Sequence, residues 1–202
     1  MSIFIFDKAY HDKGFNFTAG IDEAGRGPLA GPVTAAAVIL PKDINIQYLN
    51  DSKKLSAKKR EELFWVIKEK ALAFSIVSVD NEKIDEVNIL QATFIAMSQA
   101  VESLKTTPDI CLVDGNHKIP KLVFRQEAVI DGDAKSACIA AASILAKVTR
   151  DRIMLDYAKQ YPEYQFEKHK GYGTALHMEA LKKYGPCPIH RCSFAPVKRC
   201  VF

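Results

Sequence analysis

The sequence of 202 residues lacks a long apolar run, and it contains only five cysteines, an odd number. A membrane-spanning helix needs about twenty predominantly apolar residues, and no such stretch occurs. The apolar residues near the N-terminus are interrupted by Asp7 and Lys8, which leaves them too short for the apolar region of a secretory signal. Because disulfide frameworks belong to exported proteins, we expect free thiols and a cytoplasmic protein without membrane contact.

Several potential metal ligands lie in the C-terminal tail. Their spacing fits no standard zinc motif, so unligated side chains are the preferred interpretation and a zinc site is the alternative. The sequence indicates no role for the thiols among them. The residues concerned are Cys187, His190, Cys192 and Cys200.

An excess of charge of one sign is also absent, since 28 basic residues face 24 acidic ones and the net charge is +4. The basic residues are nevertheless clustered, and such clusters suit a polyanion, although a charged run is more often only a solvated surface. The clusters are Lys53, Lys54, Lys58, Lys59 and Arg60; Lys168, His169 and Lys170; and Arg191, Lys198 and Arg199.

Apolar periodicity predicts an α/β fold, in which strands alternate with helices after an initial hairpin. A hydrophobic fraction of 48% and a charged fraction of 26% fit one globular domain over residues 1–202. We expect a mixed sheet with helices packed on it. The predicted strands are 17–21, 33–40, 73–79, 109–113 and 122–130, and the predicted helices are 56–74, 87–104, 136–160 and 175–183.

Four carboxylates lie where an apolar element breaks into a glycine-containing turn, namely Asp22, Glu23, Asp114 and Asp133. Separately, Asp114 could be a turn residue, Glu23 a surface residue and Asp133 a cap of the following helix. Converging oxygen ligands without His or Cys select hard cations such as Mg²⁺ or Mn²⁺. Four coincidences favour a metal site. Successive strand residues point to opposite faces, so we expect the strand to end or bend at Asp22.

A site with two such cations is suited to phosphodiester hydrolysis. Gly25, Arg26 and Gly27 follow the first two carboxylates, and glycine allows the main chain to approach a sugar closely. A dinucleotide-binding module is disfavoured because Pro28 and Pro32 bracket an extended connection instead of a helix start. A non-catalytic nucleic-acid-binding protein is the other alternative, but acidic strand ends would repel phosphate without a metal.

Six motifs follow one another between about Ala19 and Phe194. They are DEAGRGP at 22–28, DSKKL at 51–55, LVDGN at 112–116, GDAKS at 132–136 with AASI at 141–144, HKGYGT at 169–174, and HRCSF at 190–194. Through these motifs the sequence closely resembles bacterial ribonuclease HII. The loop with Arg26 and the short segment before it favour this family over ribonuclease HIII. The resemblance implies a ribonuclease H-like fold, with a mixed five-stranded sheet, flanking helices and a small helical C-terminal appendage.

The resemblance also implies an activity, a metal-dependent ribonuclease H. Such an endonuclease hydrolyses the RNA strand of RNA/DNA hybrids and nicks on the 5′ side of single ribonucleotides in duplex DNA, leaving 5′-phosphate and 3′-hydroxyl ends. Hybrids and ribonucleotide-containing duplexes would be its partners. The segment from about 160 to 202 would form part of the substrate-binding groove. We expect a monomer, and contact with a replication clamp is left open.

Carried over position by position, the resemblance assigns roles to residues of this chain. Asp22, Glu23, Asp114 and Asp133 would be catalytic and would bind Mg²⁺ or Mn²⁺, two ions in the substrate complex. Gly25, Arg26 and Gly27 would read the ribonucleotide 2′-hydroxyl, largely through backbone groups. Tyr172 would stack on the sugar of the following deoxynucleotide, although the sequence alone favours a packed loop tyrosine. The phosphate-contact candidates are Lys53, Lys54, Lys135, Ser136 and Arg191.

Overall fold

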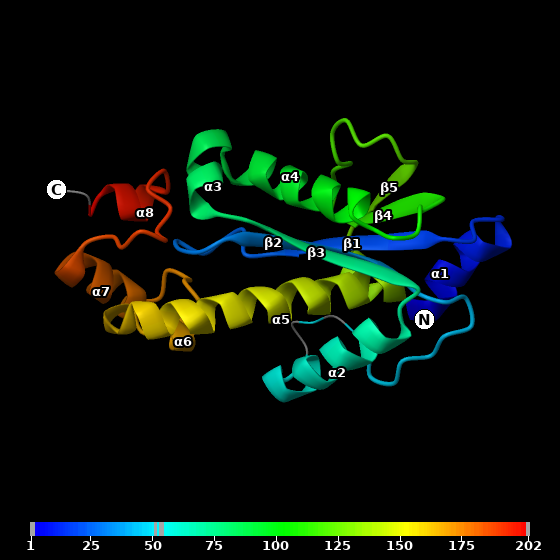
Figure 1. Cartoon of the computed structure of the whole chain (residues 1–202), viewed down its shortest axis with the longest axis horizontal. Helices are drawn as coiled ribbons and strands as arrows, with labels where there is room; N and C mark the ends of the chain where they lie inside the picture. Colours follow the sequence, from blue (N-terminus) through cyan, green and yellow to red (C-terminus); the bar gives the residue numbers. More distant parts are fainter. Residues whose placement is uncertain (1–2, 51, 53–54, 201–202) are drawn as a thin grey trace.

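A five-stranded mixed sheet organises the chain, and the computed structural model describes residues 3–50, 52 and 55–200. The strand order is β3-β2-β1-β4-β5 (Figure 1). β1 pairs antiparallel with β2 and parallel with β4, so the predicted hairpin and mixed sheet are confirmed. The strands are β1 (Thr18–Ala24), β2 (Val33–Ile39), β3 (Ala73–Val79), β4 (Ile110–Asp114) and β5 (Gln126–Val129).

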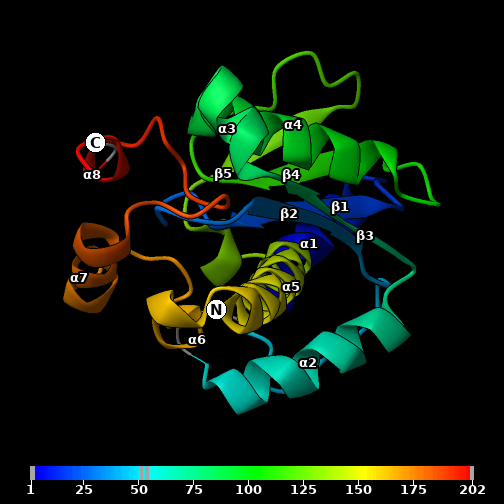
Figure 2. The ribbon, with the colours of Figure 1, turned by 60° about the vertical axis from the view of Figure 1, so that its left-hand side comes forward.

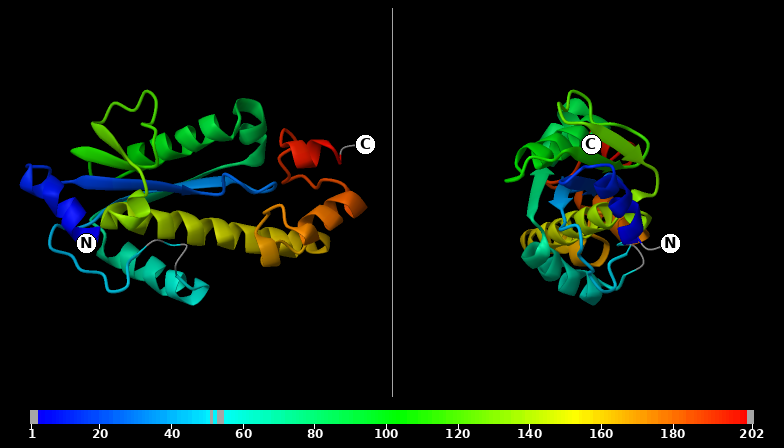
Figure 3. Two further views of the ribbon diagram at one scale, coloured as in Figure 1. Left: turned by 180° about the vertical axis from the view of Figure 1, so that it is seen from behind. Right: turned by 90° about the vertical axis from the view of Figure 1, so that its right-hand side faces the viewer.

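Helices cover both faces of the sheet (Figure 2). On one face lie α3 (Asn81–Val87) and α4 (Ile89–Glu102), and on the other α2 (Ala57–Lys70) and the long α5 (Ala137–Gln160). Three short helices gather at one end of α5, which confirms the helical appendage (Figure 3). They are α6 (Phe166–His169), α7 (Ala175–Tyr184) and α8 (Ala195–Lys198). None of the helices in the described part of the chain combines the length and apolarity needed to cross a membrane.

β1 separates two apolar cores because its side chains alternate between the faces of the sheet. Ala19 and Ile21 belong to the core beneath α4, whereas Ala24 packs with the core formed by α5. At Gly20 a Cβ atom would lie 2.1 Å from the carbonyl carbon of Cys138, so only glycine allows α5 to lie this close to β1. The close approach explains why the first half of α5 is buried, as its apolar sequence predicts.

The two edges of β1 differ in length, and this positions the site. Pairing with β4 ends at Ile21 and Val113, whereas pairing with β2 continues to Ala24 and Thr34. The expectation that the strand ends or bends at Asp22 is therefore wrong. β1 stays regular, and one of its edges continues past the paired part of β4.

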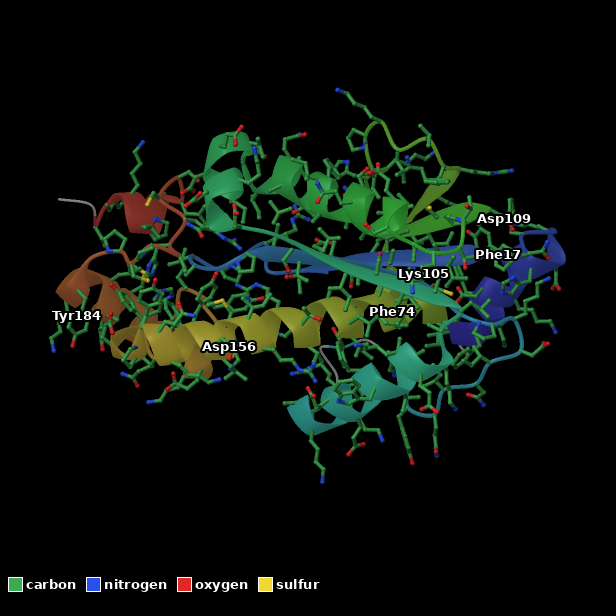
Figure 4. All side chains as sticks on the ribbon, viewed as in Figure 1. Phe17, Phe74, Lys105, Asp109, Asp156 and Tyr184 are labelled. Atoms are coloured by element: carbon green, nitrogen blue, oxygen red, sulfur yellow. The ribbon has the colours of Figure 1, made fainter. Side chains whose placement is uncertain are left out.

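Several predicted boundaries also differ from the structure. α2 begins after the cap Ser56 and ends at Lys70, because Phe74 already pairs with Val38 in the sheet (Figure 4). The helix expected over 87–104 begins at Ile89, where Asn88 has a φ of 69° and caps it. Two helices were not predicted from the sequence, the separate α3 and the N-terminal α1 (Ile3–Asp12). The strand expected over 122–130 is shorter in the structure, where β5 covers Gln126–Val129.

Candidate active site

A cavity of about 280 Å³ lies where β1 continues past its pairing with β4. Asp22, Glu23 and Asp114 line it. Asp22 is only 5% exposed and receives a hydrogen bond from Ser143 of α5, whereas Glu23 lies against residues of α4 on the opposite face. Because β4 leaves this part of β1 unpaired, Glu23 and Asp114 line both this cavity and a second pocket beside α4 on the other face. Two adjacent carboxylates thus share one site without any irregularity in the strand.

The pKa values of Asp22 and Glu23 are both raised, in part by the charge of Asp114. Burial raises the pKa of Asp22 well above its usual value, and the charges of Glu23 and Asp114 raise it further. Burial also raises the pKa of Glu23, and the guanidinium of Arg26, 3.3 Å from the Glu23 carboxylate, counteracts this. Backbone amides hold two of the groups, since Glu23 donates to Asp22 and Gly132 to Asp114, each at 2.7 Å. A bound cation would relieve the repulsion.

The donor set fits hard divalent cations that keep part of their water shell. Its ligands are oxygens, which suit Mg²⁺ and Mn²⁺. Within residues 3–50, 52 and 55–200, no three His, Cys, Asp or Glu side chains form a ready cage around one ion. Mg²⁺ does not require such a cage, because it retains several waters and binds through one or two carboxylates. Asp22, Glu23 and Asp114 can supply these.

Asp133 lies in a short 3₁₀ helix, Gly132–Ala134, which immediately precedes α5. Its side chain is buried, and it is not among the residues that line the cavity. The capping position of α5 belongs to Ser136, whose hydroxyl accepts from the Ile139 amide, and Asp7 accepts from the Cys138 amide. The role of Asp133 as a metal ligand stays a prediction.

Two of the phosphate-contact predictions are wrong because the side chains are buried. Ser136 is the cap of α5, and Arg191 is enclosed by backbone carbonyls. Lys135 is exposed and donates to the carbonyl of Ile130 at 2.6 Å, so it stays a candidate. Lys53 and Lys54 lie outside the described residues.

Arg191 holds the glycine loop, residues 25–32, from behind. Its guanidinium donates five hydrogen bonds of 2.6 to 3.1 Å to backbone carbonyls of this loop. Burial and the neighbouring Arg150 lower its pKa to about 9, which leaves it charged at neutral pH. The acceptors are the carbonyls of Gly25, Arg26, Pro28, Gly31 and Pro32.

Arg150 of α5 supports the same loop. It donates to the carbonyls of Ala30 and Pro32, and to that of Lys170 in the loop before Tyr172. Gly25 has a φ of 102°, and a Cβ there would lie 2.1 Å from Nε of Arg150. The sequence pattern gave no sign of this, because an arginine in an amphipathic helix is expected to face solvent.

Tyr172 faces the cavity beside the glycine loop. Its side chain is 43% exposed, so it is not the packed tyrosine that the sequence alone favours. Its Cε1 atom would be 3.6 Å from a Cβ at Gly27, and Nζ of Lys147 lies 5.9 Å from its ring centre. The structure thus brings Gly25, Arg26, Gly27 and Tyr172 together with three of the four predicted carboxylates.

Besides Ala24, four polar residues that were not among the predicted site residues line the cavity: Ser52, Arg60, Ser143 and Lys147. The hydroxyls of Ser52 and Ser143 are 2.9 Å apart. Ser143 and Lys147 are four residues apart, one helical turn along α5. Signals for three of them were present: Ser52 and Ser143 belong to the motifs at 51–55 and 141–144, and Arg60 belongs to the first basic cluster.

The residues of the tail pack as separate side chains. Sγ of Cys187 lies 3.1 Å from Nδ1 of His190, while Cys192 is exposed and Cys200 is buried against apolar neighbours. All five cysteines are free thiols. His169 of the second basic cluster is buried, so that cluster is not a continuous surface.

We expect Asp22→Asn to raise the melting temperature of the metal-free protein at pH 8 and to raise it less at pH 5. A carboxyl whose pKa is raised on folding contributes stability that is lost as pH rises through the raised pKa. Asparagine does not ionise, so the variant does not lose this stability at high pH. Each kcal/mol in the free energy of unfolding corresponds to about 2–4 °C in melting temperature for a chain of this size. Thermal melts in EDTA at both pH values measure the difference.

The control uses the divalent ion itself. Mg²⁺ or Mn²⁺ should raise the melting temperature of the native protein at pH 8, and that of Asp22→Asn by less, because binding stabilises the folded state. His177 and His190, whose pKa values are lowered to about 4, contribute a pH dependence of opposite sign. It is common to both proteins and cancels in their difference. Equal metal shifts in the two proteins would contradict the assignment of Asp22.

A sheet of this order, with acidic residues at the ends of the neighbouring strands β1 and β4 beside a glycine loop, is that of a metal-dependent nuclease with the ribonuclease H-like fold. Residues 19–197 match the model of the ribonuclease HII family. The chain belongs to this family, whose members cleave the RNA strand of RNA/DNA hybrids.

Individual proteins agree with this assignment. Ribonuclease HII from Endomicrobium trichonymphae is 68% identical over 196 residues, which cover 97% of this chain and 93% of that protein. The crystal structure of ribonuclease H2 from Pyrococcus horikoshii OT3 matches with a TM-score of 0.75 and 29% identity, covering 91% and 96% of the two chains. Bst-RNase HIII, solved in complex with Mn²⁺, matches with a TM-score of 0.75 and 16% identity. The match covers 92% of this chain and 69% of that protein, and at this identity it supports the fold alone.

Proposed function

We propose that this enzyme nicks duplex DNA on the 5′ side of a single embedded ribonucleotide, as well as hydrolysing the RNA strand of hybrids, and leaves 5′-phosphate and 3′-hydroxyl ends. The observation that carries the proposal is one shared cavity, in which the glycine loop and Tyr172 lie beside Asp22 and Asp114. A group that recognises one ribose can therefore act next to the groups that hold the metal.

The proposed chemistry uses two Mg²⁺ or Mn²⁺ ions, held by Asp22, Glu23, Asp114 and Asp133. When bound, such ions lower the pKa of the attacking water and stabilise the leaving oxygen. The chain itself orients the carboxylates through the amides of Glu23 and Gly132. The Mn²⁺ complex of Bst-RNase HIII supports a hard divalent ion at this fold.

The glycine loop is suited to reading a 2′-hydroxyl, the group that distinguishes RNA from DNA. The carbonyls of Gly25 and Arg26 are bonded to Arg191 and so do not turn into the cavity. Without a side chain at Gly27, the sugar has room between the loop and the ring of Tyr172, where the ring would stack on the next sugar.

The flanking phosphates would be bound by basic side chains around the cavity. Arg60 and Lys147 line it directly, and Lys135 and the lysines at 53 and 54 stay candidates. Tyr172 belongs to the segment 160–202 and lines the cavity, which supports a substrate groove formed in part by this segment. We propose that the whole chain is one catalytic domain. We also propose that the protein is a monomer in the cytoplasm.

The proposal is tested with a DNA duplex that contains one ribonucleotide, incubated with the protein and Mg²⁺, Mn²⁺ or EDTA. We expect nicking on the 5′ side of the ribonucleotide with either metal and none with EDTA, and no cleavage of the matched all-DNA duplex. Binding of the duplex without metal-dependent nicking would instead support a non-catalytic nucleic-acid-binding protein.

A further inference from the structure

Three buried histidines lie beneath the loop that carries Tyr172, and the proposed chemistry uses none of them. They are His169, His177 and His190, all inside the C-terminal appendage. The rings of His169 and His177 are stacked with their centres 4.5 Å apart, and Nε2 of His177 lies 3.0 Å from Nε2 of His190. Such closely packed imidazoles need defined proton positions.

One set of tautomers satisfies the contacts of His177 and His190. Nδ1 of His190 lies 2.9 Å from the amide nitrogen of Cys187 and 3.2 Å from its carbonyl oxygen, so the shorter contact is made when Nδ1 accepts and the proton of His190 is on Nε2. This Nε2–H donates to Nε2 of His177. The proton of His177 is then on Nδ1, and it donates to the carbonyl of Tyr172 at 3.0 Å. The result is a directed chain of hydrogen bonds from Cys187 to Tyr172.

The surroundings keep both imidazoles neutral. Burial lowers the pKa of His177 and of His190 to about 4, and each is lowered further by a neighbouring imidazole. The ring of Phe166 lies 5.5 Å from that of His177 and 5.8 Å from that of His190. Both imidazoles are therefore neutral at neutral pH, and the chain of hydrogen bonds keeps one direction there.

The same loop is fixed on its other side as well. The amide of Gly171 donates to Nδ1 of His169, and the amide of Leu29 in the glycine loop donates to the carbonyl of Gly171 at 2.8 Å. The side chain of Tyr172, by contrast, is 43% exposed, so packing alone does not set its position. The backbone on which the ring stands must supply the precision.

We propose that His177, supported by His190, is a positioning residue. It holds the backbone of Tyr172 so that the ring lies where cleavage next to a single ribonucleotide requires it. This inference rests on the proposed stacking role of Tyr172. The ring contacts the sugar, whereas His177 acts only through the backbone of Tyr172. Its loss should therefore affect a substrate that depends on Tyr172 more than a uniform hybrid, which offers many equivalent cleavage positions.

The test compares single-turnover cleavage of a duplex with one ribonucleotide and of a uniform RNA/DNA hybrid. His177→Phe should lower the first about tenfold relative to the second, the factor expected for one hydrogen bond. His177→Asn, whose amide can donate from near the position of Nδ1, should restore most of the selectivity. Equal losses on both substrates, with no recovery in His177→Asn, would overturn the inference.

A double variant separates this inference from the function on which it rests. Tyr172→Ala alone tests the stacking role, and unchanged cleavage at the single ribonucleotide would refute that role. In the Tyr172→Ala protein, His177→Phe should not change the selectivity further, because the ring it positions is gone. A full additional loss would show that His177 does not act through Tyr172.

The proton positions can be measured without any variant. Nitrogen-15 NMR of the native protein should show His177 protonated on Nδ1 and His190 on Nε2, both neutral between pH 8 and pH 5. The reverse pair of tautomers would place no donor opposite the Tyr172 carbonyl and would overturn the inference, even if His177→Phe failed to fold.

Discussion

Asp114→Asn is expected to lower the rate of cleavage by at least about 10³-fold while leaving binding of the duplex measurable. A catalytic metal supplies several kcal/mol of transition-state stabilisation, and each 1.4 kcal/mol corresponds to a factor of ten. In the native protein the amide of Gly132 donates to Oδ1 of Asp114 at 2.7 Å. The side-chain oxygen of asparagine can accept the same hydrogen bond, so the local fold should persist. Single-turnover nicking and fluorescence anisotropy measure the two quantities.

Asp109→Asn is the matched control for this experiment. Asp109 precedes the other end of β4, where its carboxylate accepts from the amides of Asn16 and Phe17, away from the cavity (Figure 4). The same change of charge in the same segment should leave the nicking rate near that of the native protein. A fully active Asp114→Asn protein would refute the assignment of Asp114 as a metal ligand.

Arg191→Met is expected to lower the free energy of unfolding by at least about 3 kcal/mol. The substitution removes the partner of five carbonyls at a fully buried position, and each buried polar group left unsatisfied costs about 1–3 kcal/mol. Water entering the space would satisfy some of them, so the sum is not the expected effect. Equilibrium unfolding in urea gives the value.

Arg199→Met makes the same chemical change at an exposed position of the same tail and should alter the stability by no more than about 0.5 kcal/mol. Arg191→Lys should fall between the two, because an ammonium group keeps the charge but cannot reach all five acceptors. If Arg191→Met unfolds at the same urea concentration as Arg199→Met, the guanidinium does not hold the loop.

The sequence predicts those parts of the fold that local patterns determine. β3 and α5 lie within a residue of their predicted bounds, because their apolar patterns are local. α2 ends before the predicted boundary at residue 74, because Phe74 pairs with Val38 in the sheet. The motifs likewise locate Asp22, Glu23 and Asp114, each of which lies at the cavity.

What the sequence could not predict depends on contacts between distant segments. Arg191 was predicted to contact phosphate because of the resemblance and its place in a basic cluster, yet its acceptors lie about 160 positions earlier in the chain. The shared site of Asp22 and Glu23 required knowing that β4 pairs with β1 only as far as Ile21. Neither fact is contained in the periodicity of any one segment.

The bonds from Arg191 to the glycine loop also set an order of events during synthesis. Asp22, Glu23 and Asp114 leave the ribosome before Arg191, whose guanidinium fixes the loop between Gly25 and Pro32. A nascent or truncated chain therefore carries the acidic residues without the element proposed to check the sugar. Selective activity should then begin only after Arg191 has been synthesised and has bonded to the loop.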